Sequence, residues 1–184
     1  MPTEKEKMLA GELYRADDPE LMADYAAAQA ILARLNATRA DDVLALVRHL
    51  GDLLGTLGEG AIVRPPLRCD YGFNIQIGAR SFVNYDCVLL DCNRITIGAD
   101  VQIGPGVHIY TATHPLDALR RRSLLESADP VVIGDGVWLG GRAVVCPGVR
   151  IGENTVVGAG SIVTGDLPAN MLAVGTPCRV LRPL

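Results

Sequence analysis

Of the three histidines in the chain, His114 is the strongest candidate for proton transfer. It lies in a polar segment, residues 110–115, that reads Tyr-Thr-Ala-Thr-His-Pro. A neutral imidazole has an ordinary pKa of about 6.5, so it accepts a proton at neutral pH and can act as a general base. A lone histidine in a polar turn is more often a surface or capping residue, so the surrounding elements decide between these interpretations.

Other catalytic and cofactor patterns are missing from the sequence. Residues 134–139, Gly-Asp-Gly-Val-Trp-Leu, lack the last glycine of a dinucleotide fingerprint, and no helical pattern follows them. The chain has no P-loop and no Gly-x-Ser-x-Gly elbow. Its cysteines form an odd set without a Cys-x-x-Cys pair, which indicates small buried side chains in a reducing cytoplasm. They are Cys69, Cys87, Cys92, Cys146 and Cys178.

Composition and charge narrow the class of protein further. The 184 residues suffice for one domain with an appendage. The composition, with 49% hydrophobic and 21% charged residues, is ordinary for a globular chain. The net charge is −4 and the longest basic run is Arg120–Arg122, so we expect no nucleic-acid partner. No run of about eighteen apolar residues and no signal-peptide pattern occurs, so we expect a cytoplasmic protein without a membrane span.

Residues 1–57 are predicted to be helical. Alanines and leucines favour a helix that ends near residues 36–38. A second helix is expected to begin at Asp41 or Asp42, because a carboxylate suits a first helical turn. The helical spacing of its apolar residues predicts one buried stripe. This stripe consists of Val43, Leu46, Val47, Leu50 and Leu54.

From residue 60 onward a period of six residues replaces the helical pattern. Glycine follows the first position of the period at seven places, and the fifth position is small or branched. Neither a helix nor an ordinary strand has this period, whereas a parallel β-helix with three hexapeptides per coil does. The first positions are all Ile, Leu or Val: Ile77, Val83, Leu89, Ile97, Ile103, Ile109, Ile133, Leu139, Val145, Ile151, Val157 and Val163.

The period predicts how the coils are built and where they are interrupted. We expect the first position to point into a narrow core, residues eighteen apart to stack, and the second-position glycines to turn corners with positive φ. The repeat fails after His114, where Pro115, Arg121 and Ser127 stand in core positions. Residues 115–130 are therefore expected to leave the solenoid as a loop, which is either a tolerated insertion or a functional element.

The hexapeptide pattern resembles that of the hexapeptide-repeat acyltransferases, and longer segments resemble the maltose, galactoside and nodulation-type sugar O-acetyltransferases. These segments are Glu4–Tyr14, Cys69–Ile75 and Gly106–Pro115. The resemblance implies a mainly β fold, a left-handed parallel β-helix with an N-terminal α-helical cap and an extruded loop. The implied parts are a cap at 1–57, a β-helix at 58–167 with the loop at 115–130, and a C-terminal arm at 168–184. The resemblance also implies a homotrimer with active sites between subunits.

The resemblance assigns roles around the acceptor. His114 matches the catalytic histidine before the loop, and Asn84 matches an acceptor-site asparagine whose amide assists the transition state. Galactoside enzymes carry an aspartate where this chain has Cys92, a difference that argues against galactosides. Positions at or beside the family's sugar contacts hold three carboxylates, Asp17, Asp70 and Asp91.

The resemblance implies acetyl-CoA as the co-substrate and no metal. Gly141, through its backbone amide, and Ala159 and Thr164 match positions along the pantetheine arm. Arg179 and Arg182 match residues that hold the CoA phosphates, a role that suits guanidinium groups because they form paired, charge-assisted hydrogen bonds.

The implied reaction is direct acetyl transfer from acetyl-CoA to a sugar hydroxyl, with maltose or glucose as the favoured acceptor. His114 takes the hydroxyl proton, amides near Gly141 and Asn84 stabilise the oxyanion, and the loop limits water. The alternatives are a galactoside or chitooligosaccharide acceptor, and a β-helical protein that binds sugar or CoA without catalysis.

A γ-type carbonic anhydrase on the same scaffold is disfavoured. Its zinc site needs three imidazoles that converge from neighbouring coils. His49 lies in the helical part and His108 only six residues before His114, so we interpret His108 as structural. Trp138, the single tryptophan, fits the core, a subunit interface or the acceptor wall equally well.

Overall fold

Three helices precede the solenoid in the computed structural model, which describes all 184 residues. They are α1 (Glu4–Ala10), α2 (Pro19–Ala37) and α3 (Val43–Leu53). Each begins at a side chain that accepts a hydrogen bond from the first turn, namely Thr3, Asp18 and Asp42. The predicted ends of the first long helix and the predicted start at Asp42 are therefore confirmed. None of the helices is both long and apolar enough to cross a membrane.

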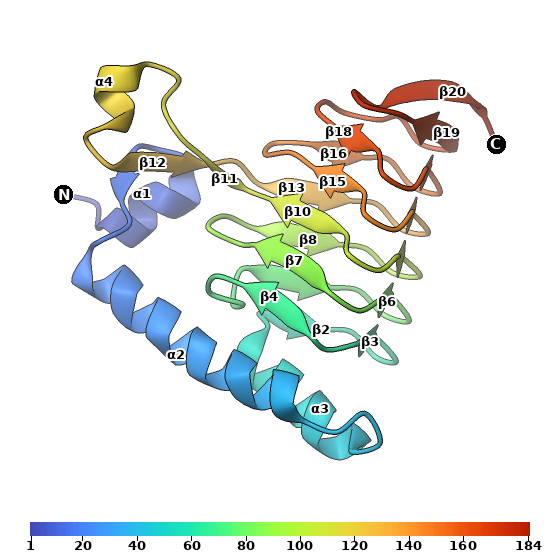
Figure 1. Cartoon of the computed structure of the whole chain (residues 1–184), viewed down its shortest axis with the longest axis horizontal. Coiled ribbons are helices and arrows are strands. Elements are labelled where there is room, and N and C mark those ends of the chain that lie inside the picture. The colour runs from blue at the N-terminus through green and yellow to red at the C-terminus, as the bar shows by residue number, and fades with distance from the viewer.

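Helix α2 runs obliquely across the lower end of the solenoid (Figure 1). The amide of Asn36 donates to the carbonyl of Leu67 at 2.8 Å and accepts from its N–H at 2.9 Å. Further along the helix, the Gln29 amide donates to the carbonyls of Cys69 and Asp70 at 2.9 and 3.1 Å. These bonds fix the helical cap to the first coil.

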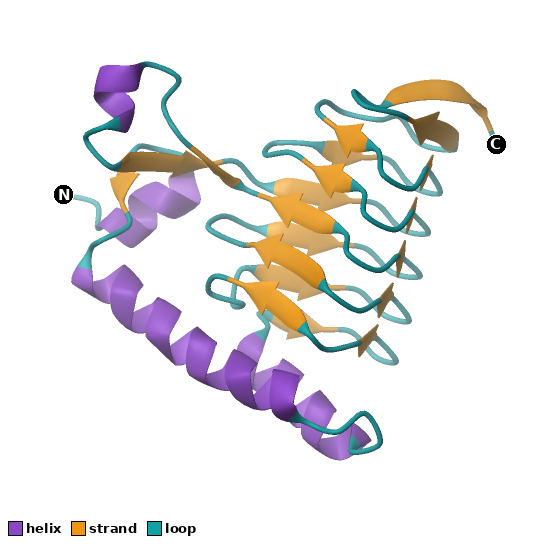
Figure 2. Cartoon of the chain, viewed as in Figure 1, coloured by secondary structure: helices purple, strands orange, loops and turns teal.

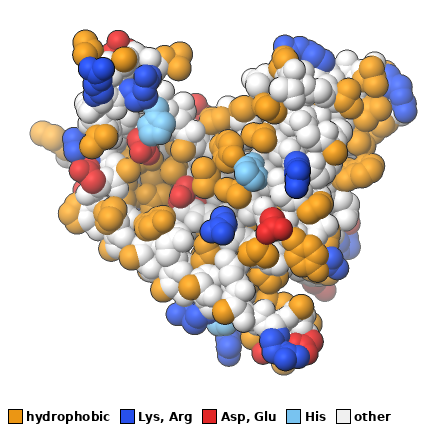
Figure 3. Space-filling view, viewed as in Figure 1, with side chains coloured by type: hydrophobic (Ala, Val, Ile, Leu, Met, Phe, Trp, Pro, Cys, Tyr) orange, Lys and Arg blue, Asp and Glu red, His pale blue; other side chains and the backbone are white.

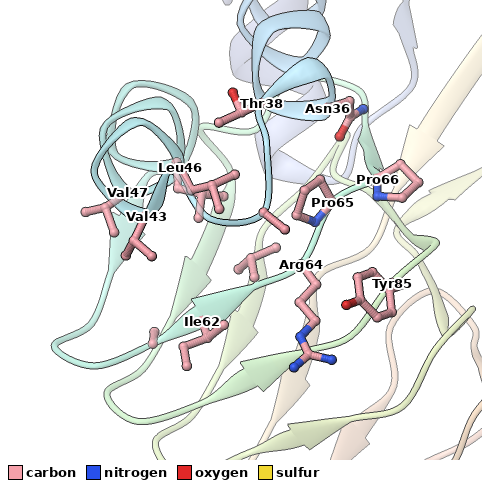
Figure 4. A pocket seen from close by; sticks show the side chains of 14 residues that line it. Asn36, Thr38, Val43, Leu46, Val47, Ile62, Arg64, Pro65, Pro66 and Tyr85 are labelled. Atoms are coloured by element: carbon pink, nitrogen blue, oxygen red, sulfur yellow. The ribbon is translucent and has the colours of Figure 1, made fainter.

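The apolar stripe of α3 is only half buried. Leu50 and Leu54 are buried, but Val43 and Val47 are 61% and 51% exposed, so the prediction is wrong for these two valines. The helix contacts α2 and the start of the solenoid, which leaves its N-terminal half over an open apolar groove of about 440 Å³. Figure 4 shows Val43 and Val47 above Ile62 in this groove.

The solenoid consists of three stacks of short parallel strands (Figure 2). The first sheet contains β4 (Leu67–Cys69), β7 (Cys87–Leu90), β10 (His108–Tyr110), β15 (Val144–Val145) and β18 (Ile162–Val163). The second sheet contains β2 (Thr56–Leu57), β5 (Ile75–Ile77), β8 (Ile95–Ile97), β13 (Val131–Ile133) and β16 (Arg150–Ile151). The third contains β3 (Ile62–Val63), β6 (Phe82–Val83), β9 (Gln102–Ile103), β14 (Trp138–Leu139), β17 (Val156–Val157) and β19 (Met171–Val174). At its edge β20 (Arg179–Pro183) pairs antiparallel with β19. The predicted parallel β-helix is confirmed.

All twelve first-position residues are buried, none with more than 2% of its surface exposed, so the predicted core is confirmed. We call the segments that lead from the first sheet to the second corner one, and those that lead from the third sheet back to the first corner three. Stacked residues are eighteen apart in the upper coils, as Trp138 and Val156 are, so the predicted spacing is confirmed there. They are twenty apart in the lower coils, as Ile75 and Ile95 are, and thirty-six apart where the excursion intervenes, as His108 and Val144 are. The two extra residues lie in corner one.

The second-position glycines serve stacking rather than positive φ. A Cβ on Gly140 would lie 2.4 Å from the backbone nitrogen of Ala159 in the next coil, and Gly152 meets Ala169 at the same distance. Positive φ occurs two residues later, at the fourth position of the hexapeptide, for example at Arg142 with φ of 59°. The prediction of positive φ at the second position is wrong, because close coil-to-coil contact excludes a side chain there instead.

The interrupted repeat forms an excursion from corner one. It comprises β11 (Ala112–Thr113), α4 (Ala118–Arg121) and β12 (Leu125–Ala128). Strand β8 pairs directly with β13, so the predicted extruded loop replaces no coil. Strand β12 pairs antiparallel with both β11 and β1 (Tyr14–Arg15), which makes a three-stranded sheet in the order β1-β12-β11.

Candidate active site

His114 directly follows β11 at the base of the excursion, and its side chain is exposed. Strand β11 pairs Thr113 with Ser127 on β12. Continued by one residue, this antiparallel register sets His114 opposite Glu126, and opposite residues lie on the same face of a sheet. The excursion therefore carries the candidate base and a carboxylate together.

Asp91 organises the corner-one turn at residues 70–74. Its carboxylate is fully buried and accepts the backbone N–H groups of Asp70 at 3.0 Å, Tyr71 at 2.9 Å and Asn74 at 3.3 Å. Burial raises the pKa of Asp91 to about 6 against these donors, which favour the charged form. These hydrogen bonds occupy the Asp91 carboxylate and fix the backbone at Asp70.

Asp70 faces a cavity of about 270 Å³ between α2, β1 and the excursion. The Cys92 thiol donates to the Asp70 carboxylate at 3.5 Å. Burial raises the pKa of Asp70, the thiol donor opposes this rise, and the charge of Glu126 adds to it. The cavity is lined by Tyr14, Ala16, Leu21, Met22, Tyr25, Asp70, Tyr71, Cys92 and Glu126.

Glu126 is a polar cavity residue that the sequence did not single out. Its carboxylate accepts the hydroxyl of Tyr14 at 3.1 Å, and Tyr14 is fully buried. The two residues are register partners between β1 and β12 although 112 positions separate them. No hexapeptide period runs through the excursion, so only the long-range strand pairing reveals this carboxylate.

Asp17 lies outside the cavity lining. Arg15 holds its carboxylate through two hydrogen bonds of 3.0 and 2.9 Å, and the Asp17 side chain is 63% exposed. The Arg15 guanidinium lowers the pKa of Asp17. The carboxylate is an exposed, charged group close to Ala16 at the cavity wall.

Asn84, Gly141 and Ala159 lie together on corner three. The Asn84 Oδ1 accepts the N–H of Tyr85 at 2.9 Å, which leaves the Nδ2 group free to donate. In the upper coils, Gly160, the residue after Ala159, donates its N–H to the carbonyl of Gly141 at 3.0 Å. The three predicted residues thus lie on the same corner of different coils.

The residues predicted to hold CoA extend to the last coil. Thr164 and Arg179 line the same open cavity, of about 600 Å³, at the end of the solenoid. The Arg179 and Arg182 guanidinium groups donate only to the carbonyls of Cys178 and Pro183, and neither is paired with a carboxylate. Both side chains are exposed, so their charges are available to an anion.

The two predicted catalytic residues, His114 and Asn84, lie at opposite ends of the first sheet. Strand β7 runs from the turn of Asn84 to Asp91, so corner three precedes each strand of that sheet and corner one follows it. Asp70, Asp91 and His114 belong to corner one, whereas Asn84 and Gly141 belong to corner three. A single chain therefore does not bring His114 and Asn84 together.

The structure also shows the environments of His108, Trp138 and the basic run Arg120–Arg122. The His108 Nδ1 forms a hydrogen bond with the hydroxyl of Tyr110 on the same strand. Trp138 is 55% exposed, which excludes a place in the core. Arg120–Arg122 are exposed, and on the face in Figure 3 the basic side chains are scattered rather than gathered. No group of three or more His, Cys, Asp or Glu side chains is placed to hold a metal ion.

Sequence comparisons agree with this architecture. The maltose acetyltransferase hexapeptide capping motif matches residues 7–58, and the bacterial transferase hexapeptide, as six repeats, matches residues 130–165. Nodulation protein L of Rhizobium meliloti is 52% identical over 178 residues, which cover 97% of each chain.

Solved structures extend the likeness to the whole chain. A maltose O-acetyltransferase from Clostridium difficile 630 superposes with a TM-score of 0.98 at 45% identity, covering 100% of this chain and 98% of the other. A hexapeptide-repeat acetyltransferase from Vibrio cholerae, solved with acetyl coenzyme A, gives 0.93 at 40% identity and covers 100% and 99%. The chain therefore belongs to the hexapeptide-repeat acetyltransferases that carry the maltose acetyltransferase capping motif.

Proposed function

We propose that the protein transfers an acetyl group from acetyl-CoA to a hydroxyl of a sugar, with His114 as the general base. The observation that carries this proposal is the position of His114 at the base of the excursion. It follows the last register pair of β11 and β12, Thr113 with Ser127, and Glu126, the residue before Ser127, lines the cavity. Maltose or glucose is the favoured acceptor, and a galactoside or a chitooligosaccharide is the alternative.

The proposed reaction is a direct transfer within a ternary complex. Neutral His114 removes the proton of the acceptor hydroxyl as its oxygen attacks the thioester carbonyl. The C–S bond of the tetrahedral intermediate then breaks, and His114 returns the proton to the CoA thiolate. The products are the acetylated sugar and CoA, and the imidazole ends neutral.

Charge on the tetrahedral oxygen needs donors that His114 does not supply. The free Nδ2 group of Asn84 and the backbone N–H of Gly141, which takes no part in the backbone ladder, are suited to this task. Both lie on corner three, at the other end of the first sheet. We infer that a second copy provides them, in a closed homotrimer with each site between two subunits.

The co-substrate contacts are proposed to extend along the upper coils to the end of the solenoid. Ala159 and Thr164 would line the pantetheine arm, and the unpaired guanidinium groups of Arg179 and Arg182 would hold the phosphates.

The five cysteines are all free thiols, which supports a place in the reducing cytoplasm.

The test is release of the CoA thiol from acetyl-CoA with glucose, maltose, galactosides and chitooligosaccharides. We expect one sugar to support release in the wild type, and His114→Ala to lower the rate by about 100-fold to 10,000-fold, the usual worth of a general base. His49→Ala is the matched control, because His49 lies on α3 away from the cavity. A wild type that releases no CoA with any sugar would favour the binding-only alternative, and an unchanged rate in His114→Ala would refute the assigned base.

A further inference from the structure

The cavity beside the excursion has an unusual chemical character. Its walls are three tyrosine rings and several aliphatic side chains, and none of its nine lining residues is basic. Its only carboxylates, Asp70 and Glu126, come from corner one and from the excursion. A negative charge in such surroundings has no cationic partner within the chain, and burial without a partner is costly.

Both carboxylates are held in place by neutral donors. The Tyr14 hydroxyl donates to Glu126 at 3.1 Å, and the Cys92 thiol donates to Asp70 at 3.5 Å. Neighbouring charge also acts on the rings, since Glu126 and Asp70 add to the rise that burial produces in the pKa of Tyr71. Within the chain, therefore, no basic side chain lines the cavity and neither carboxylate is part of an ion pair.

We propose that this cavity selects the sugar acceptor by charge, with Glu126 as the specificity-determining residue. A sugar that carries a protonated amino group is preferred to its neutral counterpart, and a sugar that carries an anion is rejected. This inference rests on the proposed function and adds the class of acceptor.

An ammonium group interacts favourably with both the carboxylates and the tyrosine rings of the cavity. It donates charge-assisted hydrogen bonds to the Glu126 and Asp70 carboxylates, which are stronger than those from a hydroxyl. The tyrosine faces attract a cation through their ring quadrupoles. A sulfate or carboxylate on the sugar would instead face two like charges without a compensating base.

The experiment compares acceptors that differ only at carbon 2: glucosamine, glucose, N-acetylglucosamine and N-sulfoglucosamine. We expect kcat/KM at neutral pH to be about tenfold higher for glucosamine than for glucose, the worth of one charge-assisted hydrogen bond, and lowest for N-sulfoglucosamine. Acetylation at oxygen rather than nitrogen is checked by NMR of the product. Equal kcat/KM for the four sugars would overturn the inference but leave the proposed function standing, whereas no turnover of any sugar would refute the proposed function itself.

Variants of the cavity are judged by the glucosamine-to-glucose ratio, which does not depend on how much of a variant folds. Glu126→Gln keeps the shape and removes the charge, so this ratio is expected to fall about tenfold. Tyr14→Phe removes only the hydroxyl that places Glu126 and is expected to lower the ratio by less. Glu153→Gln, an exposed glutamate on another corner, is the control and should keep the wild-type ratio. An unchanged ratio in Glu126→Gln would show that Glu126 does not determine the specificity.

Discussion

At the scale of single residues, the corner-one carboxylates separate by burial into a structural and an accessible group. Asp91 is fully buried and bonded to three backbone N–H groups, whereas Asp70 faces the cavity. The family resemblance predicts both as sugar contacts and does not distinguish them. The coil-to-coil hydrogen bonds of the turn show that Asp91 is occupied, which leaves Asp70 as the accessible carboxylate.

The pKa of Asp91 predicts how the stability of the protein depends on pH. Burial raises this pKa to about 6 in the folded state, above its ordinary value of 3.8, so the folded state holds the proton more tightly than the unfolded state. The associated stabilisation is complete below about pH 4 and is lost as the pH rises through 6. It amounts to about 3 kcal/mol.

Urea unfolding of the wild type and of Asp91→Asn from pH 4 to 7 measures this effect. The free energy of unfolding of the wild type should fall relative to that of the variant across this range, because the asparagine does not titrate. Parallel pH profiles for the two proteins would contradict the assigned pKa shift.

At the scale of the elements, the hexapeptide period determines the core but not the corners. The period identifies inward positions because a narrow lumen admits only branched aliphatic side chains. It does not reveal whether a glycine is required by a positive φ or by close contact with a neighbouring coil, because glycine satisfies both requirements. The pairing of β12 with β1 is likewise hidden, because it joins segments more than a hundred residues apart.

The stacking role of the second-position glycines predicts a selective loss of stability. In Gly152→Ala the new Cβ would lie 2.4 Å from the backbone nitrogen of Ala169, so the two coils must separate. We expect a loss of about 2 kcal/mol in the free energy of unfolding, typical of overpacking. Gly165→Ala is the control, because nothing lies within 4 Å of its Cβ. Equal stability of the two variants would contradict the stacking role.

At the scale of the whole molecule, the separation of His114 from Asn84 makes the proposed site a shared property of two copies. Mixing His114→Ala with Asn84→Ala subunits, after dissociation and reassembly, creates interfaces that hold His114 from one chain and Asn84 from the other. Random assembly gives about a quarter of the wild-type sites. Activity of the mixture should therefore rise well above that of either variant alone, whereas a site within one chain would give no recovery.

The sheet formed by β1, β12 and β11 has a consequence for folding. Most neighbouring coils join residues eighteen or twenty positions apart, and those on either side of the excursion join residues thirty-six apart. The solenoid can therefore grow coil by coil through contacts of modest sequence separation. The hairpin of β11 and β12 that carries the candidate base is also local, since Ala112 pairs with Ala128, but its outer edge pairs only when Tyr14 meets Glu126, 112 residues later. Local contacts therefore suffice for the solenoid and the hairpin, and one long-range contact joins the hairpin to the N-terminal segment. A partly folded chain can accordingly have its solenoid in place while the cavity wall that Tyr14 forms is still missing.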